Sequence, residues 1–147
     1  MQIRKAVAKD FKTIKALSRK YDFERNRDWK GVMKAKDNEM FVLVEDKRIV
    51  GFTGLVRNDW NETLQVLDIF VEPGLRKQGA GRKMVEFLKK RAHAMNKYRC
   101  LIAEAPALDG TDRFYRKCGF RRCGYNDRYY SNTNPMDIAV WMSYDLR

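Results

Sequence analysis

The chain has 147 residues, with 31 lysines and arginines against 19 aspartates and glutamates, and a formal net charge of +12 at pH 7. A hydrophobic content of 44% with 12% aromatic residues excludes an intrinsically disordered chain. No apolar run approaches the roughly 20 residues of a membrane-spanning helix, and the N-terminus lacks the apolar core of a signal peptide. These features predict one domain over residues 1–147 of a cytoplasmic protein that contacts no membrane and is a monomer or homodimer.

Side chains that commonly bind metal are scarce. The cysteines Cys100, Cys118 and Cys123 have no metal-ligand spacing, and His93 is the only histidine. We therefore expect no metal site and three reduced thiols, most of them buried. The positive charge should attract anions, and composition leaves open a nucleic acid, an acidic protein or a phosphorylated cofactor as the partner.

The N-terminal half alternates between strand and helix patterns. Apolar residues recur at helical spacing early in the chain, and β-rich runs follow, two of them separated only by Asp46-Lys47. That dipeptide predicts a hairpin, so antiparallel strands precede the middle of the chain. The predicted order is a strand at 3–6, a helix through Phe11, Ile14, Leu17 and Tyr21, a short helix within 22–39, and strands at 40–45, 48–57 and 63–71.

The second half begins with a long amphipathic helix. Its apolar face and an apolar run after it predict a strand–helix–strand crossover, in which the strands at 63–71 and 99–105 are parallel. Turn residues then separate shorter elements near the C-terminus. The predicted order is a helix at 79–95, a strand at 99–105, a helix at 112–117 that stops at Gly119, and two strands, one starting at Phe120 and one at 137–146, joined by a polar loop at 126–135 that carries tyrosines and could overhang a site.

The most informative segment is residues 67–82, where an apolar strand runs through a Pro-Gly turn and a basic, glycine-spaced loop into the long helix. Free N–H groups and the positive end of a helix dipole predict a phosphate or pyrophosphate site. A nucleoside-triphosphate loop needs Lys-Ser or Lys-Thr after its last glycine, but Gly81 is followed by Arg82 and Lys83. A dinucleotide loop needs a third glycine where Met84 stands. Both of these alternatives fit poorly.

Two motifs together resemble the GNAT superfamily of acetyl-CoA-dependent N-acetyltransferases. The motifs are Arg76-x-x-Gly79-x-Gly81 and Tyr115-x-x-x-Gly119-Phe120. The resemblance extends to residues 3–6 and to the strand before the loop, and so covers nearly the whole chain. It departs at Cys118, where the family usually has a large apolar residue, and at Asp109, where an asparagine is common. It implies an α/β GNAT fold, with a mixed, mostly antiparallel sheet that is flanked by helices and whose central parallel strands splay apart.

The resemblance implies acetyl transfer from acetyl-CoA to a primary amine, by direct attack in a ternary complex and without a metal. Tyr115 matches the general acid that protonates the CoA thiolate. Glu104 stands where many members keep the carboxylate that deprotonates the amine, and Asp68 is its rival. The implied cofactor-binding residues are Ile69, Phe70 and Val71 along the pantetheine arm, Arg76, Lys77, Gln78, Gly79, Ala80, Gly81 and Arg82 around the pyrophosphate, and Tyr115.

The acceptor is left open. The net charge favours a protein amine, or an amine on an anionic carrier such as aminoacyl-tRNA, within a ribonucleoprotein. Free polycations should be repelled unless Asp59, Glu62 and Asp68 form a local acidic mouth. The alternatives are a small-molecule amine and a non-catalytic, basic nucleic-acid-binding module whose tyrosines stack on bases. That module would use Tyr125, Tyr129 and Tyr130, interleaved with Arg121, Arg122 and Arg128.

Overall fold

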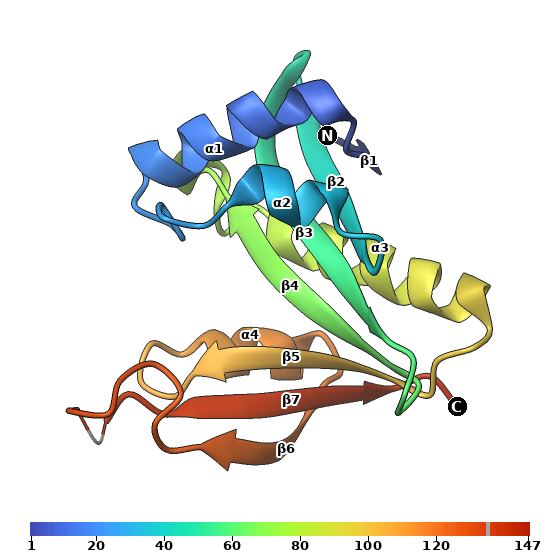
Figure 1. Cartoon of the computed structure of the whole chain (residues 1–147), viewed down its shortest axis with the longest axis vertical. Helices are drawn as coiled ribbons and strands as arrows, with labels where there is room; N and C mark the ends of the chain where they lie inside the picture. Colours follow the sequence, from blue (N-terminus) through green and yellow to red (C-terminus); the bar gives the residue numbers. More distant parts are fainter. Residues whose placement is uncertain (135) are drawn as a thin grey trace. The chain divides into compact units, whose positions relative to one another are not determined.

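The computed structural model describes residues 1–134 and 136–147, so Pro135 of the predicted polar loop lies outside the described residues. The chain divides into two compact units (Figure 1). The first unit contains Met1–Arg57 and Leu67–Leu88, and the second contains Asn58–Val66 and Lys89–Arg147. The assignment of the whole chain to one domain stays a prediction.

The elements follow the predicted order, with ends within about two residues of those expected. The strands are β1 (Gln2–Lys5), β2 (Asn38–Glu45), β3 (Arg48–Asn58), β4 (Thr63–Val71), β5 (Cys100–Pro106), β6 (Arg121–Asn126) and β7 (Ala139–Asp145), paired in the order β1-β2-β3-β4-β5-β7-β6. The helices are α1 (Phe11–Lys20), α2 (Trp29–Lys34), α3 (Ala80–Met95) and α4 (Thr111–Lys117), with single 3-10 turns η1 (Ala8–Asp10) and η2 (Pro73–Leu75). Within the described part of the chain, no helix is long and apolar enough to cross a membrane.

The hairpin of β2 and β3 is closed by the predicted dipeptide. Asp46 and Lys47 have φ angles of 48° and 64°. Two consecutive left-handed residues make a type I′ turn, whose twist matches that of antiparallel strands. The strands pair antiparallel from Asn38 opposite Val56 to Glu45 opposite Arg48. The hairpin prediction is therefore confirmed.

The first unit buries apolar side chains on both faces of its strands. On one face, Phe52 of β3 and Phe70 of β4 stack with ring centroids 4.9 Å apart, and Trp29 of α2 meets Phe52 edge-on at 5.0 Å. The predicted apolar stripe of α1 closes this cluster through Ile14 and Leu17. On the other face, a second cluster joins strand residues to the start of α3; its buried members are Leu43, Val50, Val71, Ala80 and Met84. Alternating strand side chains thus serve both faces, and the end of β4 is fixed in the core.

The second unit contains the parallel pair that the crossover predicted. Thr63–Gln65 of β4 lie opposite Cys100–Ile102 of β5 in parallel register. The remaining pairs, β5 with β7 and β6 with β7, are antiparallel. Along β5, Ala103 and Ala105 are fully buried, while Glu104 between them is partly exposed on the opposite face. The expectation of mostly buried thiols holds for Cys100 and Cys118, whereas Cys123 is exposed.

Helix α4 is tied to β6 by an ion pair. Arg122 donates hydrogen bonds from Nε (3.0 Å) and Nη2 to Oδ2 of Asp112, whose side chain is buried. The hydrogen bond from Arg122 lowers the pKa of Asp112 below 3.8. A carboxyl group with a depressed folded-state pKa stabilises the fold above its unfolded pKa, and this contribution is lost as the pH falls through the folded value.

We expect Arg122→Leu to destabilise the protein by about 1–3 kcal/mol at pH 7, because it leaves the buried Asp112 carboxylate without its main partner. Urea denaturation at pH 7 and pH 3 measures the effect. The difference from wild type should shrink at pH 3, where Asp112 of the variant is protonated. A difference that grows on acidification would contradict this role. Arg121→Leu, which removes an exposed pair with Asp145 on the same strand, is the matched control.

Candidate functional site

The glycine loop connects η2 to the first turn of α3 in the first unit. Lys77 and Gly79 have φ angles of 61° and 86°, so the chain makes a left-handed turn immediately before the helix. The backbone N–H of Lys83 donates to the Gly79 carbonyl at 2.9 Å. The N–H groups that precede Lys83 in the first turn have no acceptor inside the helix, because helical bonds begin only at the fourth residue. The loop can therefore offer a row of N–H donors to an anion.

The loop side chains hold this backbone in place. Arg76 donates from Nε to the Val71 carbonyl at 2.9 Å, and its guanidinium carbon lies 5.9 Å from the centroid of the Phe70 ring. The Gln78 amide donates to the Gly74 carbonyl at 3.0 Å. Arg76 keeps further N–H donors on the same guanidinium, since a guanidinium has five. The result is an exposed basic loop anchored to the end of β4.

The strand before the loop presents backbone rather than side chains. Phe70 and Val71 are buried in the two clusters of the first unit, and Ile69 packs against the second of them. A ligand along this part of β4 would therefore meet main-chain N–H and C=O groups. The expectation that Ile69, Phe70 and Val71 lie along the pantetheine arm stays a prediction.

Gly79 is required for its conformation and not for space. A Cβ at Gly79 meets nothing within 4 Å, but its φ of 86° strains any other residue. We expect Gly79→Val to weaken acetyl-CoA binding by at least tenfold in calorimetry, because relief of roughly 1–2 kcal/mol of strain shifts the N–H groups. Gly74→Val is the control, because Gly74 also has open space and lacks the positive φ. Equal binding by both variants would contradict the assigned role of the loop conformation.

Asp68 on β4 is paired with a permanent cation. Arg27, from the segment between α1 and α2, donates to Oδ2 of Asp68, and its other amino group lies 3.2 Å from Glu24. The Arg27 guanidinium carbon also lies 5.0 Å from the ring centroid of Trp29. An arginine stays protonated at all ordinary pH values. The positive charge of Arg27 opposes the approach of a second cation, such as a protonated amine, to Asp68.

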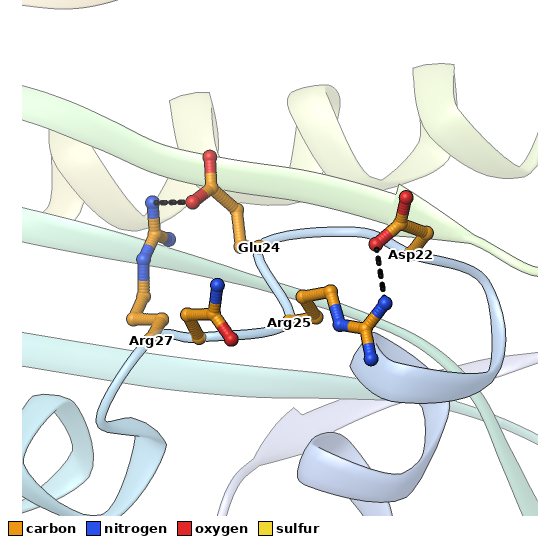
Figure 2. Close-up of a pocket in the computed structure, with 5 residues that line it drawn as sticks. Asp22, Glu24, Arg25 and Arg27 are labelled. Atoms are coloured by element: carbon orange, nitrogen blue, oxygen red, sulfur yellow. Dashed lines mark ion pairs between the residues drawn. The ribbon is translucent and has the colours of Figure 1, made fainter.

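The same segment lines an open pocket of roughly 620 Å³ (Figure 2). Its lining side chains are charged or polar, and two ion pairs lie among them, Arg25 with Asp22 at 3.5 Å and Arg27 with Glu24 at 3.2 Å. The lining residues are Asp22, Glu24, Arg25, Asn26 and Arg27. Such a pocket suits a polar or charged small molecule. The lining side chains would then form ion pairs with that molecule in place of those they form with each other.

The other two acids of the suggested acidic mouth are also compensated. Asp59 accepts a hydrogen bond from the Tyr98 hydroxyl at 2.8 Å and pairs with Lys97 at 2.9 Å. Glu62 pairs with Arg147 at 2.6 Å. Because each of these carboxylates has a basic partner, they add little net negative charge to the surface.

Tyr115 lies in α4 of the second unit and is 5% exposed. Gly119, with a φ of 90°, ends the helix, and the Phe120 N–H then donates back to the Tyr115 carbonyl at 3.1 Å. This C-cap brings the Phe120 ring edge-on to Tyr115, with centroids 5.3 Å apart. Burial, and secondarily Cys118 and Tyr130, raises the pKa of Tyr115 well above 10. The phenol therefore carries its proton throughout the neutral range.

Glu104 lies on β5 of the same unit and has two aromatic neighbours. It is the cross-strand partner of Trp141 on β7, and its Oε2 accepts a hydrogen bond from the hydroxyl of Tyr129. Tyr129 and Tyr130 belong to the connection between β6 and β7 and meet edge-on at 5.0 Å. Sequence reasoning expected this connection to overhang a site but did not assign either tyrosine to Glu104 or Tyr115.

Both departures from the family motifs have local structural roles. Oδ1 of Asp109 accepts the Thr111 N–H at 2.9 Å, and so caps the backbone where α4 begins. Cys118 is buried at the end of α4, where its N–H donates to the Tyr115 carbonyl at 3.0 Å. Cys118 is therefore placed as a core residue. Among the described residues, no group of three or more histidine, cysteine or acidic side chains could hold a metal ion.

One curated relative shares substantial sequence. Streptothricin acetyltransferase of Streptomyces lavendulae is 31% identical over 113 residues, which are 73% of this chain and 58% of that protein. The chain thus spans less than two thirds of the relative's length.

Solved acetyltransferases share the fold at low identity. An aminoglycoside 6'-N-acetyltransferase complexed with coenzyme A superposes with a TM-score of 0.80 at 14% identity, over 100% of this chain and 98% of that one. A chimaera of the spermidine N-acetyltransferase SpeG from Vibrio cholerae and hSSAT gives 0.83 at 13% identity, over 99% and 95%. These likenesses confirm the predicted mixed, mostly antiparallel fold. The sequence model of the acetyltransferase (GNAT) family matches residues 2–120, and the chain therefore belongs to that family.

Proposed function

We propose that this chain transfers the acetyl group of acetyl-CoA to a primary amine of a small molecule, by direct attack while both substrates are bound. The observation that carries the proposal is the environment of Tyr115. A phenol that is buried and holds its proton at neutral pH, at the position of the family's general acid, can donate a hydrogen to a departing thiolate.

The cofactor would be held by the glycine loop and the end of β4. The N–H groups of residues 78–82 would bind the pyrophosphate, and the charges of Arg76 and Lys77 would add attraction. The backbone of residues 69–71 would follow the pantetheine arm. One N–H of that strand would polarise the thioester carbonyl and stabilise the oxyanion that forms during attack.

The chemistry requires two proton transfers. An amine is mostly an ammonium ion at neutral pH, so it must lose one proton before it attacks, and Glu104 would pass that proton to solvent. The nitrogen then bonds to the thioester carbon, the carbon–sulfur bond breaks, and Tyr115 donates a proton to the sulfur. The second proton that the nitrogen loses replaces the one Tyr115 gives up. The products are the N-acetyl amine, CoA thiol and one released proton.

A small-molecule acceptor is favoured over protein or tRNA by the relatives. The proteins named above act on streptothricin, aminoglycosides and spermidine, all of them small molecules. A non-catalytic nucleic-acid-binding module is disfavoured, because the chain belongs to an acetyltransferase family.

Calorimetric titration with acetyl-CoA, with NADH and ATP as controls, tests the cofactor. Thiol release is then measured against separate pools of aminoglycosides, streptothricins, polyamines, peptides and tRNA. We expect acetyl-CoA alone to bind tightly, and only small-amine pools to release thiol. Release with peptides or tRNA alone would overturn the acceptor class, and no binding of acetyl-CoA would overturn the proposal.

A further inference from the structure

We propose that Glu104, Tyr129, Tyr130 and Trp141 form a binding site for the ammonium group of the acceptor. This inference rests on the proposed function, because it assigns the amine specificity of the same reaction. The site would select compact cationic amines through one carboxylate and the faces of aromatic rings. All four residues belong to the second unit.

The strand register places Glu104 and Trp141 on one face. They lie directly opposite each other in the antiparallel pair of β5 and β7, so their side chains point to the same side, with Cβ atoms about 5 Å apart. The next residue on β7, Met142, is fully buried and lies opposite Arg122, which pairs with Asp112 of α4. Because successive strand residues alternate, Glu104 and Trp141 face away from α4.

Two tyrosines from the β6–β7 connection complete the group. The hydroxyl of Tyr129 donates to Oε2 of Glu104, and the ring of Tyr130 stands nearly perpendicular to that of Tyr129, at 86° and 5.0 Å. Tyr130 also contributes to the raised pKa of Tyr115, so it lies within electrostatic range of the proposed general acid. The three aromatic residues are partly exposed, with Tyr129 at 43%, Tyr130 at 49% and Trp141 at 38%.

This chemistry matches an alkylammonium ion. A carboxylate accepts several hydrogen bonds, so Glu104 can keep Tyr129 and also bind an N–H of the ligand. Aromatic faces attract ammonium groups, and clusters of such rings recognise even quaternary ammonium ions that have no N–H. The site is therefore expected to bind a cation in a protein whose net charge is +12. A neutral molecule of the same shape would gain only the apolar contact.

Choline and its neutral isostere 3,3-dimethylbutan-1-ol test the site without any reaction, since choline has no N–H to acetylate. Binding to the full chain is measured by ligand-observed NMR and calorimetry. We expect choline to bind at least tenfold more tightly than the isostere and to compete with the amine acceptor. Tyr130→Leu and Trp141→Leu should each weaken choline binding about five- to tenfold.

Two matched variants control for loss of an exposed ring. Tyr125→Leu and Trp60→Leu replace residues that are 71% and 88% exposed, and both variants should bind choline as the wild type does. Equal binding of choline and the isostere, or equal losses in control and test variants, would overturn the ammonium site. Selective choline binding without thiol release for any amine would leave this site standing and overturn the proposed function. Thiol release without selective choline binding would overturn the ammonium site and leave the proposed function standing.

Discussion

Replacing Tyr115 by phenylalanine should lower kcat for thiol release by about 100-fold or more, the usual range for loss of a positioned general acid. The change removes only the hydroxyl, and the ring keeps its edge-on contacts with Phe114 and Phe120. The midpoint of thermal unfolding should therefore stay near that of the wild type, and the KM for acetyl-CoA should change little. Steady-state thiol release and calorimetric unfolding measure the two effects.

The pH dependence separates Tyr115 from other acids. Its pKa is raised by burial, so the neutral phenol persists through pH 6–9, and no limb of the activity profile in that range should belong to it. In the unfolded chain its pKa is about 10, lower than in the folded chain. The contribution of Tyr115 to the free energy of unfolding is therefore fully present below pH 10 and is lost as the pH rises above 10. Tyr144→Phe in β7, which also removes one phenol hydroxyl, is the matched control and should keep its activity. Full activity in Tyr115→Phe would show that another donor protonates the thiolate.

Local sequence patterns predicted the elements well for physical reasons. The stripe through Ile14 and Leu17 needed only helical periodicity, and the turn at Asp46 lay between two β-rich runs of the sequence. Gly119 ended α4 where the sequence placed it, because a left-handed cap favours glycine. These features depend on neighbours in the chain and are visible without tertiary structure.

The interaction partner of each candidate carboxylate could not be predicted from local sequence patterns. Asp68 is paired with Arg27, 41 residues away in sequence, and Glu104 with Tyr129, 25 residues away. Such contacts depend on how loops lie over the strands. Cys123 shows the same limit, because it sits where the register of β6 and β7 shifts between Arg122 and Gly124, and it is exposed.

These pairings also change how the net charge is interpreted. The net charge of the chain favoured an acceptor on an anionic carrier. A bound acceptor, however, interacts mainly with the charged groups at its own site. The described carboxylates near the candidate sites differ in partner: Asp68 has a guanidinium, whereas Glu104 has a neutral phenol. At Asp68 a cationic amine would meet the like charge of Arg27, whereas Tyr129 beside Glu104 carries no charge. This contrast favours Glu104 as the base.

Glu104→Gln and Asp68→Asn should therefore have different consequences. We expect Glu104→Gln to lower kcat/KM about 100-fold at pH 7, because the amide still accepts the Tyr129 hydrogen bond but cannot take a proton. Asp68→Asn should lower kcat/KM much less and should instead destabilise the fold by about 1–3 kcal/mol, because Arg27 loses an ionic partner. Kinetics and urea denaturation on both variants measure the difference.

The dependence on pH distinguishes a base from a binding residue. The amine pKa is near 10, so at high pH most of the acceptor is already neutral and needs no base. The deficit of Glu104→Gln in kcat, measured at saturating acceptor, should therefore shrink steadily between pH 7 and pH 10, while a loss due to weaker binding would appear in KM. Arg27→Gln alone should reproduce the stability loss of Asp68→Asn. If instead Asp68→Asn shows the deficit that disappears at high pH and Glu104→Gln does not, then Asp68 is the base despite its pair with Arg27.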